Sequence, residues 1–239
     1  MAERLPEEFA AALAATVAER GHFGARLRYA AEVGSTNDLA VAAADRGEPE
    51  GTTFVAGAQT AGRGRLGRTW FSEPGANLLL SIVMQAPADP ARAPRLCLLW
   101  AAAIAETIDV RVKWPNDLVD ADGRKLGGLL AELDHGRVVL GIGLNANQLT
   151  FPGVDGATSL RELRGAPIDR LALLVDVLRA VRAVDYAEDL SRWRSRNITL
   201  GQRVAIAGRT GVAEDVRDDG ALIVDGVPVL TGDVELLSS

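Results

Sequence analysis

The chain has 239 residues, of which 48% are hydrophobic and 24% are charged, a balance typical of a soluble globular protein with a sizeable core. Its net charge of −6 excludes a general nucleic-acid binder, and its single cysteine, Cys97, excludes a disulfide within the chain and is expected to be a small buried core residue. No apolar run is long enough to span a membrane and no apolar signal core follows Met1, so we expect a cytoplasmic protein.

The first quarter of the chain contains two helical and two strand patterns. In chain order these are a helix at 5–20, a strand at 27–33, a helix at 39–44 and a strand at 52–56. Ser35 or Thr36 can cap the second helix, and Ser35-x-x-Asp38 matches a capping box. The same hydroxyl and amide groups at a helix start can also bind a polar ligand. Taken alone, these residues favour capping.

Residues 59–70, Gln-Thr-Ala-Gly-Arg-Gly-Arg-Leu-Gly-Arg-Thr-Trp, are the most unusual stretch of the chain. Its glycines let the backbone approach a ligand closely, and its arginines carry permanent charges that fit phosphate or carboxylate. Gly62-x-Gly64-x-x-Gly67 also matches a dinucleotide fingerprint, but the following residues are unsuited to the helix that this fingerprint requires. The stretch is therefore either a solvated basic turn or a loop that closes over an anion. Without an anion, its like charges predict a mobile loop.

The middle of the chain predicts further strands and two long helices. In chain order these are a strand at 77–85, a helix at 89–108, a strand at 110–113, a hairpin of 118–119 and 125–132, a strand at 137–144, a short helix at 158–163 and a helix at 169–196. The hairpin turns at Asp122-Gly123, which is a strong turn signal. Gly141 and Gly143 lie inside a strand, where glycine often marks the close approach of a ligand.

Beyond Asn197 the pattern changes to short strands interrupted by Gly, Asp and Pro, at 202–207, 211–217, 221–225, 227–230 and 234–237. This spacing predicts a small β-barrel. We therefore expect two domains, 1–197 and 198–239. Because strands and helices do not alternate regularly along the chain, the expected fold class is α+β, with a mixed central β-sheet and helices on one face.

Four segments together resemble biotin–protein ligase: Ser35-Thr36-Asn37, the stretch 59–70, Lys113-Trp114-Pro115-Asn116-Asp117 and Arg124-Lys125-Leu126-Gly127-Gly128. The resemblance runs from about Val33 to Asn147 and includes the glycine-rich strand end at 141–147. It implies a fold like that of class II synthetases, with a C-terminal SH3-like barrel. It also implies a two-step reaction. ATP, with Mg²⁺, activates biotin to biotinyl-5′-AMP, and a lysine of a biotin carboxyl carrier protein domain then receives the biotin.

The resemblance also implies roles for single residues. The residues expected to bind biotin, the first four at its ureido ring, are Ser35, Thr36, Asn37, Gln59, Arg63, Gly64, Arg65 and Lys125. Those expected to bind ATP or the adenylate are Arg63, Arg65, Arg68, Trp70, Asn116, Lys125 and Asn145. Lys125 and Arg65 are the expected catalytic residues, with Lys125 acting as a charge clamp near the α-phosphate rather than as a nucleophile.

Some roles stay open at this stage. Trp114 is either a wall of the adenine site or a core residue, and Asn116 orients either adenine or a metal ion. The two histidines are far apart, and no Cys/His spacing predicts a zinc site, so no metal ligand is assigned.

Three alternatives compete with the biotin ligase interpretation. A lipoate or octanoate ligase or transferase of the same fold is expected to carry an Arg-Arg-x-x-Gly-Gly-Gly-type segment, which Gly62-Arg63-Gly64-Arg65 does not match. A non-catalytic biotin or nucleotide binder would need no phosphate clamp, and a nucleic-acid binder is disfavoured by the net charge. We expect no DNA partner, because about one helix precedes Ser35, and no membrane partner. The expected state is a monomer or weak homodimer.

Overall fold

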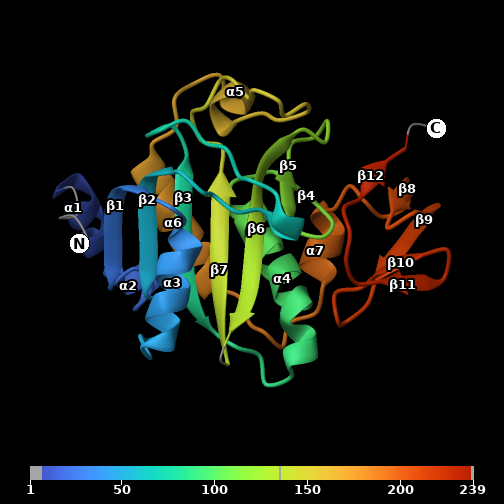
Figure 1. The fold of residues 1–239 in the computed structure, drawn as a ribbon, viewed down its shortest axis with the longest axis horizontal. Coiled ribbons are helices and arrows are strands. Elements are labelled where there is room, and N and C mark those ends of the chain that lie inside the picture. The colour runs from blue at the N-terminus through green and yellow to red at the C-terminus, as the bar shows by residue number, and fades with distance from the viewer. Residues whose placement is uncertain (1–6, 135, 238–239) are drawn as a thin grey trace.

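The computed structural model describes residues 7–134 and 136–237, which form a large sheet packed with helices and a second, smaller sheet (Figure 1). The large sheet has seven strands in the order β1-β2-β3-β7-β6-β5-β4. These are β1 (Leu27–Val33), β2 (Thr53–Gln59), β3 (Leu78–Gln85), β4 (Arg111–Lys113), β5 (Asp117–Val119), β6 (Lys125–Asp134) and β7 (Arg137–Leu144). β1 and β2 pair in parallel and the other neighbours pair antiparallel, which confirms the predicted α+β fold with a mixed sheet.

The helices fall where the sequence predicts them but differ in extent. They are α1 (Glu7–Ala15), α2 (Val17–Arg20), α3 (Thr36–Asp45), α4 (Ala93–Thr107), α5 (Leu160–Arg164), α6 (Arg170–Arg182) and α7 (Ser191–Arg196), with 3₁₀ turns η1 (Arg65–Gly67) and η2 (Pro90–Arg92). Residues 5 and 6 of the first predicted helix lie outside the described residues, and its remainder is divided into α1 and α2. None of the described helices is long and apolar enough to cross a lipid bilayer.

The single helix predicted over residues 169–196 is wrong at its centre, where α6 ends and a non-helical segment precedes α7. The buried guanidinium of Arg95 donates to the carbonyl oxygens of Tyr186, at 2.7 Å, and of Glu188. A carbonyl held this way is turned out of a helical ladder, so the segment bends around Arg95. The apolar period of the sequence carries no sign of this distant partner.

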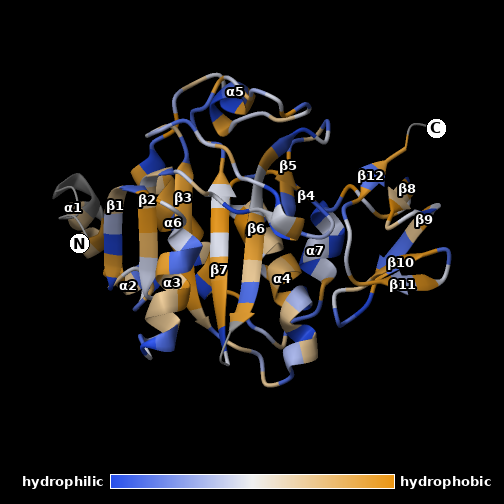
Figure 2. Ribbon diagram, viewed as in Figure 1, coloured by the Kyte–Doolittle hydropathy of each residue, from blue (hydrophilic) through white to orange (hydrophobic). Residues whose placement is uncertain are grey.

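The two faces of the large sheet carry different helices. Successive side chains of a strand point to opposite faces. From β3, Leu80 and Ile82 join the main core with α4 and α6, whereas Val83 joins a smaller core with Ala40 and Ala43 of α3. Helices α4, α6 and α7 lie together on one face of the sheet, as predicted, and α3 covers the opposite face (Figure 1). Figure 2 shows β3 almost entirely hydrophobic, as expected for a strand covered on both sides.

The smaller sheet is antiparallel, with the order β11-β10-β9-β8-β12, and matches the predicted C-terminal barrel. Its strands are β8 (Arg203–Ile206), β9 (Arg209–Val216), β10 (Leu222–Val224), β11 (Val227–Val229) and β12 (Glu235–Leu236). Val204 and Leu222 belong to the same apolar core as the large sheet, so the small sheet packs firmly on it. We propose the domain boundary between residues 197 and 198, because the strands of the two sheets lie on either side of it.

Candidate active site

A cavity of about 360 Å³ lies beside the start of α3. Its walls are formed by β6, β7, the loop 59–70 and Asp233 of the C-terminal domain. The residues with a predicted role that line it are Ser35, Thr36, Asn37, Gln59, Arg63, Gly64, Arg65, Arg68, Trp70, Asn116, Lys125 and Asn145. Trp114 differs, because it is 1% exposed and its indole Nε1 donates to the carbonyl oxygen of Gly220, 3.0 Å away in the C-terminal part. It therefore joins the two domains as a core residue and forms no adenine wall.

The start of α3 supplies one end of the cavity. The Ser35 hydroxyl accepts the backbone N–H of Asn37 at 3.3 Å and caps the helix, as the sequence predicts. The backbone N–H of Thr36 donates to Gln59 Oε1 at 2.7 Å, and Thr36 Oγ1 lies 3.1 Å from the same oxygen. Since these side chains also line the cavity, capping and ligand recognition are compatible functions of the same residues. The side chains of Ser35, Thr36 and Gln59 that face this end are polar and uncharged.

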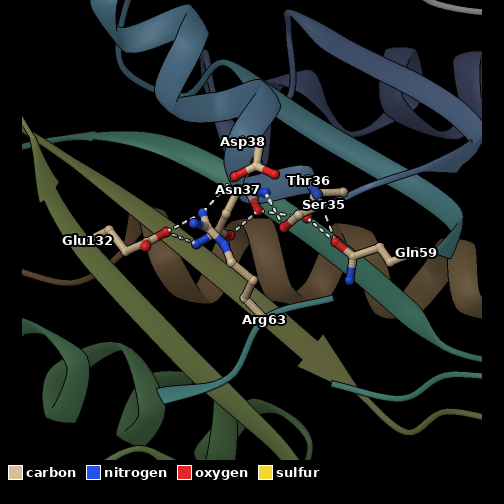
Figure 3. Close-up of polar contacts among 8 residues, drawn as sticks. Ser35, Thr36, Asn37, Asp38, Gln59, Arg63 and Glu132 are labelled. Atoms are coloured by element: carbon tan, nitrogen blue, oxygen red, sulfur yellow. Dashed lines mark hydrogen bonds and ion pairs between the residues drawn. The ribbon is translucent and has the colours of Figure 1, made fainter. Parts of the chain in front are cut away.

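Ser81 and Glu132 complete this end, and sequence reasoning missed both. The Ser81 hydroxyl lies 2.8 Å from Thr36 Oγ1 and 2.5 Å from Asn37 Oδ1. Asn37 Nδ2 donates to Glu132 Oε2 at 2.6 Å (Figure 3). Ser81 is fully buried between apolar neighbours of β3, and a lone hydroxyl in such a strand is the signal that could have found it. Glu132 has no comparable signal in the sequence.

Gly141 and Gly143 of β7 make room for side chains of the protein itself. A Cβ at Gly141 would lie 2.2 Å from Asn37 Oδ1, and one at Gly143 would lie 2.7 Å from Cε2 of Trp70. Both distances are impossibly short, so Asn37 and Trp70 can lie flat on β7 only above glycine. The predicted close approach is present, and in this structure a side chain makes it.

The loop 59–70 is tied down by acidic residues. Arg63 Nη2 lies 3.0 Å from Asp38 Oδ1 and 2.9 Å from Glu132 Oε2. Further along, Arg68 pairs with Asp233, and Arg65 donates to the carbonyl oxygen of Gly232 at 3.1 Å. The prediction of a mobile loop assumed that the arginines repel one another without an anion. That assumption is wrong, because carboxylates of the protein compensate their charges. Whether the loop moves stays a prediction.

Lys125 lies at the other, charged end of the cavity. Its Nζ is 2.6 Å from Asp117 Oδ1 and 5.7 Å from the centre of the Trp70 ring, within range of a cation–π contact. The backbone N–H of Lys125 donates to the Gly156 carbonyl at 2.7 Å, which fixes the first residue of β6. A partly exposed cation with a fixed backbone is suited to meet an anionic ligand, and Asp117 holds it in place meanwhile.

Asn116 and Asn145 line the cavity close to Arg65 and Lys125. Asn116 Nδ2 donates to the carbonyl oxygen of Leu129, and its Oδ1 lies 3.5 Å from Nη1 of Arg65. Asn145 Nδ2 donates to the carbonyl oxygen of Thr158 at 3.0 Å. Both amides thus hold the backbone around the cavity and orient its lining. Among the described residues, no three His, Cys, Asp or Glu side chains gather as a metal site.

Comparisons with known proteins agree with this arrangement. A model of the biotin/lipoate A/B protein ligase family matches residues 32–148. A biotin–[acetyl-CoA-carboxylase] ligase of Mycobacterium tuberculosis is 35% identical over 238 residues, covering 87% of this chain and 88% of that protein. The chain belongs to the biotin protein ligase family.

Two further relatives support this membership. The bifunctional ligase/repressor BirA of Escherichia coli is 36% identical over 218 residues, covering 79% of this chain and 67% of that protein. A biotin protein ligase of Aquifex aeolicus, solved in complex with biotin and ATP, has a TM-score of 0.76 and 28% identity, covering 90% of this chain and 99% of the other. The family match begins and ends within a residue of the resemblance found in the sequence.

Proposed function

We propose that this chain is an ATP-dependent biotin–protein ligase, which converts biotin and ATP to biotinyl-5′-AMP and then transfers biotin to a lysine of a biotin carboxyl carrier protein domain. The observation that carries the proposal is a single cavity with two unlike ends. Ser35, Thr36, Asn37 and Gln59 offer neutral hydrogen-bonding groups that suit the ureido ring. Arg65, Arg68 and Lys125 offer cations that suit the phosphates of ATP.

In the first step, an oxygen of the biotin carboxylate forms a bond to the α-phosphorus of ATP, and pyrophosphate leaves with the electron pair of the broken P–O bond. Negative charge grows on the non-bridging oxygens and on the leaving group. On this proposal Lys125 neutralises the α-phosphate, and Arg65 and Arg68 neutralise the other phosphates. Binding biotin at the α3 end aims its valerate chain along the cavity toward Lys125.

In the second step, the neutral ε-amine of the carrier lysine attacks the carbonyl carbon of the mixed anhydride, AMP leaves, and the amine loses a proton to solvent. The loop 59–70 must keep water from the anhydride until the carrier arrives. Arg63 and Arg65, anchored at opposite ends of the cavity, hold this loop across the adenylate.

Mg²⁺ is the metal that this reaction needs, and the cavity fits it in one respect. Mg²⁺ in nucleotide sites is commonly held by one or two carboxylates together with phosphate oxygens and water. Asp117 and Asp233 line the charged end and would supply such carboxylates. When bound, Mg²⁺ would neutralise further charge on the phosphates.

Pyrophosphate release from ATP, measured with and without biotin, tests the proposal directly. We expect release to depend on biotin, and lipoate to be a poor substitute, which distinguishes the lipoate or octanoate alternative. A purified carrier domain should then gain one biotin at its lysine. Pyrophosphate release that is indifferent to biotin would contradict the proposal. We further propose that the protein acts in the cytoplasm and has no DNA partner. We also propose that it is a monomer or weak homodimer, and light scattering after size exclusion measures this oligomeric state.

A further inference from the structure

Glu132 links three elements that are far apart in the sequence. From β6, its Oε2 accepts hydrogen bonds from Asn37 Nδ2 of α3, at 2.6 Å, and from Arg63 Nη2 of the loop, at 2.9 Å. Asp38 is a second carboxylate on the same guanidinium, 3.0 Å from Nη2. Figure 3 shows Glu132 reaching this cluster from the side opposite Gln59. Only one of the two carboxylates, Glu132, also binds Asn37 among the described contacts.

The carboxylate of Glu132 fixes the orientation of Asn37. An ionised carboxylate accepts hydrogen bonds and cannot donate them, so the side of the Asn37 amide that faces it must be the NH₂ group. Asn37 Oδ1 then faces Ser81, whose hydroxyl is 2.5 Å away and donates its one proton there. Ser81 Oγ, 2.8 Å from Thr36 Oγ1, can therefore only accept the Thr36 hydroxyl proton, which leaves Gln59 Oε1 to the backbone N–H of Thr36.

The direction set at Glu132 extends through Ser81 to the Thr36 hydroxyl, which lines the cavity, while the backbone N–H of Thr36 sets the direction of Gln59. Gln59 Oε1 accepts the backbone N–H of Thr36 at 2.7 Å, which leaves the Gln59 amide nitrogen turned away from Thr36 (Figure 3). This end of the cavity thus presents donors from Gln59 and an acceptor from the Thr36 hydroxyl oxygen. A cyclic urea carries one carbonyl acceptor and two N–H donors. Its recognition needs donors and acceptors in fixed places, because a reversed group leaves a buried polar atom unpaired.

We propose that Glu132 is a positioning residue for biotin recognition, which sets the hydrogen-bond direction at the ureido end through Asn37 and Ser81 without touching biotin. The inference rests on the proposed function, since it names what organises the same site. Glu132 should affect biotin binding more than ATP binding. The cations at the charged end have other carboxylate partners, Asp117 for Lys125 and Asp233 for Arg68.

Two alanine variants separate this role from a general effect on the loop. In Glu132→Ala, the Asn37 amide is free to reverse, and we expect the Kd for biotin by calorimetry to rise roughly ten- to hundredfold. The KM for ATP in biotin-dependent pyrophosphate exchange should change less than about twofold. Asp38→Ala is the matched control, because it takes a carboxylate from the same Arg63 atom and leaves the partners of Asn37 in place. Its Kd for biotin should change less than about threefold.

A charge-swapped pair provides the rescue. Asn37→Asp alone places two carboxylates in contact, which should weaken biotin binding at least as much as Glu132→Ala. In Asn37→Asp combined with Glu132→Gln, the new glutamine amide donates to the new aspartate, which still accepts from Ser81. We expect the double variant to recover to within about fivefold of the wild-type Kd. Thermal unfolding of each variant checks the fold. If Glu132→Ala does not fold, the biotin Kd of the double variant tests the role of Glu132 instead.

The outcomes are distinguishable from failure of the proposed function. Wild-type protein that binds biotin together with a Glu132→Ala variant of equal affinity would overturn the role of Glu132 alone. Equal damage from Asp38→Ala and Glu132→Ala would show that both act through Arg63, which also overturns it, as would a double variant that folds but does not recover. Wild-type protein that does not bind biotin would overturn the proposed function itself.

Discussion

The two ends of the cavity are built differently. At the α3 end, Thr36, Asn37 and Ser81 are buried and joined in a chain of neutral hydrogen bonds, with one carboxylate at its far end. At the other end, Lys125 and Arg68 are more exposed, and each pairs with a carboxylate. The first end lies on the large sheet, while the second includes Asp233 from the segment between β11 and β12 of the C-terminal domain. One end is organised before a ligand arrives, and the other holds ion pairs that an anion must replace.

This difference assigns separate tasks to the two ends. Buried neutral groups in fixed directions discriminate well, because a wrong partner leaves a polar atom unpaired. Exposed ion pairs contribute little stability, so a phosphate can displace their carboxylates at small cost. The α3 end should therefore decide which acid is activated, and the charged end should decide how fast it is activated and how long the product stays.

Lys125→Ala should give the largest effect. Removing a cation aimed at a developing phosphate charge typically lowers kcat by about 10²–10³, and we expect that loss in biotin-dependent ATP–pyrophosphate exchange. The fold should persist, because the side chain is partly exposed. Arg124→Ala is the matched control, since the adjacent cation pairs with Asp120 and is not part of the described cavity lining. Near wild-type exchange in Lys125→Ala would exclude the charge-clamp role.

Arg65→Gly should release biotinyl-AMP early. A hydrogen bond between charged groups is worth roughly 1.5–3 kcal/mol, which corresponds to about ten- to hundredfold faster escape if the loss falls on the off-rate. Adenylate synthesis should suffer less, because Arg63, Arg68 and Lys125 remain. The escaped anhydride then biotinylates bystander lysines, which a blot of an unrelated lysine-rich protein detects. Bystander labelling no higher than with wild type, while adenylate is still made, would count against retention by Arg65.

Asp233→Ala should loosen the loop in the absence of ligand. Arg68 would lose its carboxylate partner, and the positive charges of the loop would no longer be compensated from the C-terminal side. We expect trypsin to cleave after Arg65 or Arg68 about three- to tenfold faster than in wild type, with protection restored by biotin and ATP. Glu235→Ala is the control, since this exposed residue lies two positions further on. Equal cleavage rates in all three proteins would show that Asp233 does not hold the loop.

Much of the fold was predictable from the sequence, because its signals are local. The strand at 137–144 and the hairpin at Asp122-Gly123 follow from apolar runs and a turn signal within a few residues. The break between α6 and α7 was not predictable, because it depends on Arg95, which is about ninety positions earlier in the chain. A periodic pattern reports which face of a helix is buried, and it cannot report a side chain that takes the carbonyl groups.

The cavity shows the same division between local and distant signals. The residues to which the four motifs assign a ligand-binding role lie in one cavity. Each motif was recognisable in the sequence because it has its own distinctive spacing. Of the carboxylates that hold these residues, Glu132 and Asp233 went unassigned and Asp38 was predicted only as part of a capping box. Acidic residues are common, and pairing with a distant partner leaves no local pattern. For Trp114 the motif left both a ligand wall and a core residue open, and the bond of its indole to Gly220 decides for the core residue.

Cys97 should give the smallest effect. It lies half-buried under Ala131 of β6, and by strand alternation Glu132 points to the other face of that strand. Burial raises the pKa of the Cys97 thiol to about 11, so at pH 8 only about one thiol in a thousand is ionised and nucleophilic. Because the folded pKa is raised, the stability linked to this group is present below the unfolded pKa and is lost as the pH rises through about 11.

Because so little of the Cys97 thiol is ionised at pH 8, treatment with iodoacetamide at that pH should leave pyrophosphate exchange within about twofold of the untreated protein. Cys97→Ala should do the same. Rapid alkylation of the native protein together with loss of exchange would show that the packing between α4 and β6 opens in solution. The α3 end would then be less rigid than its hydrogen bonds require.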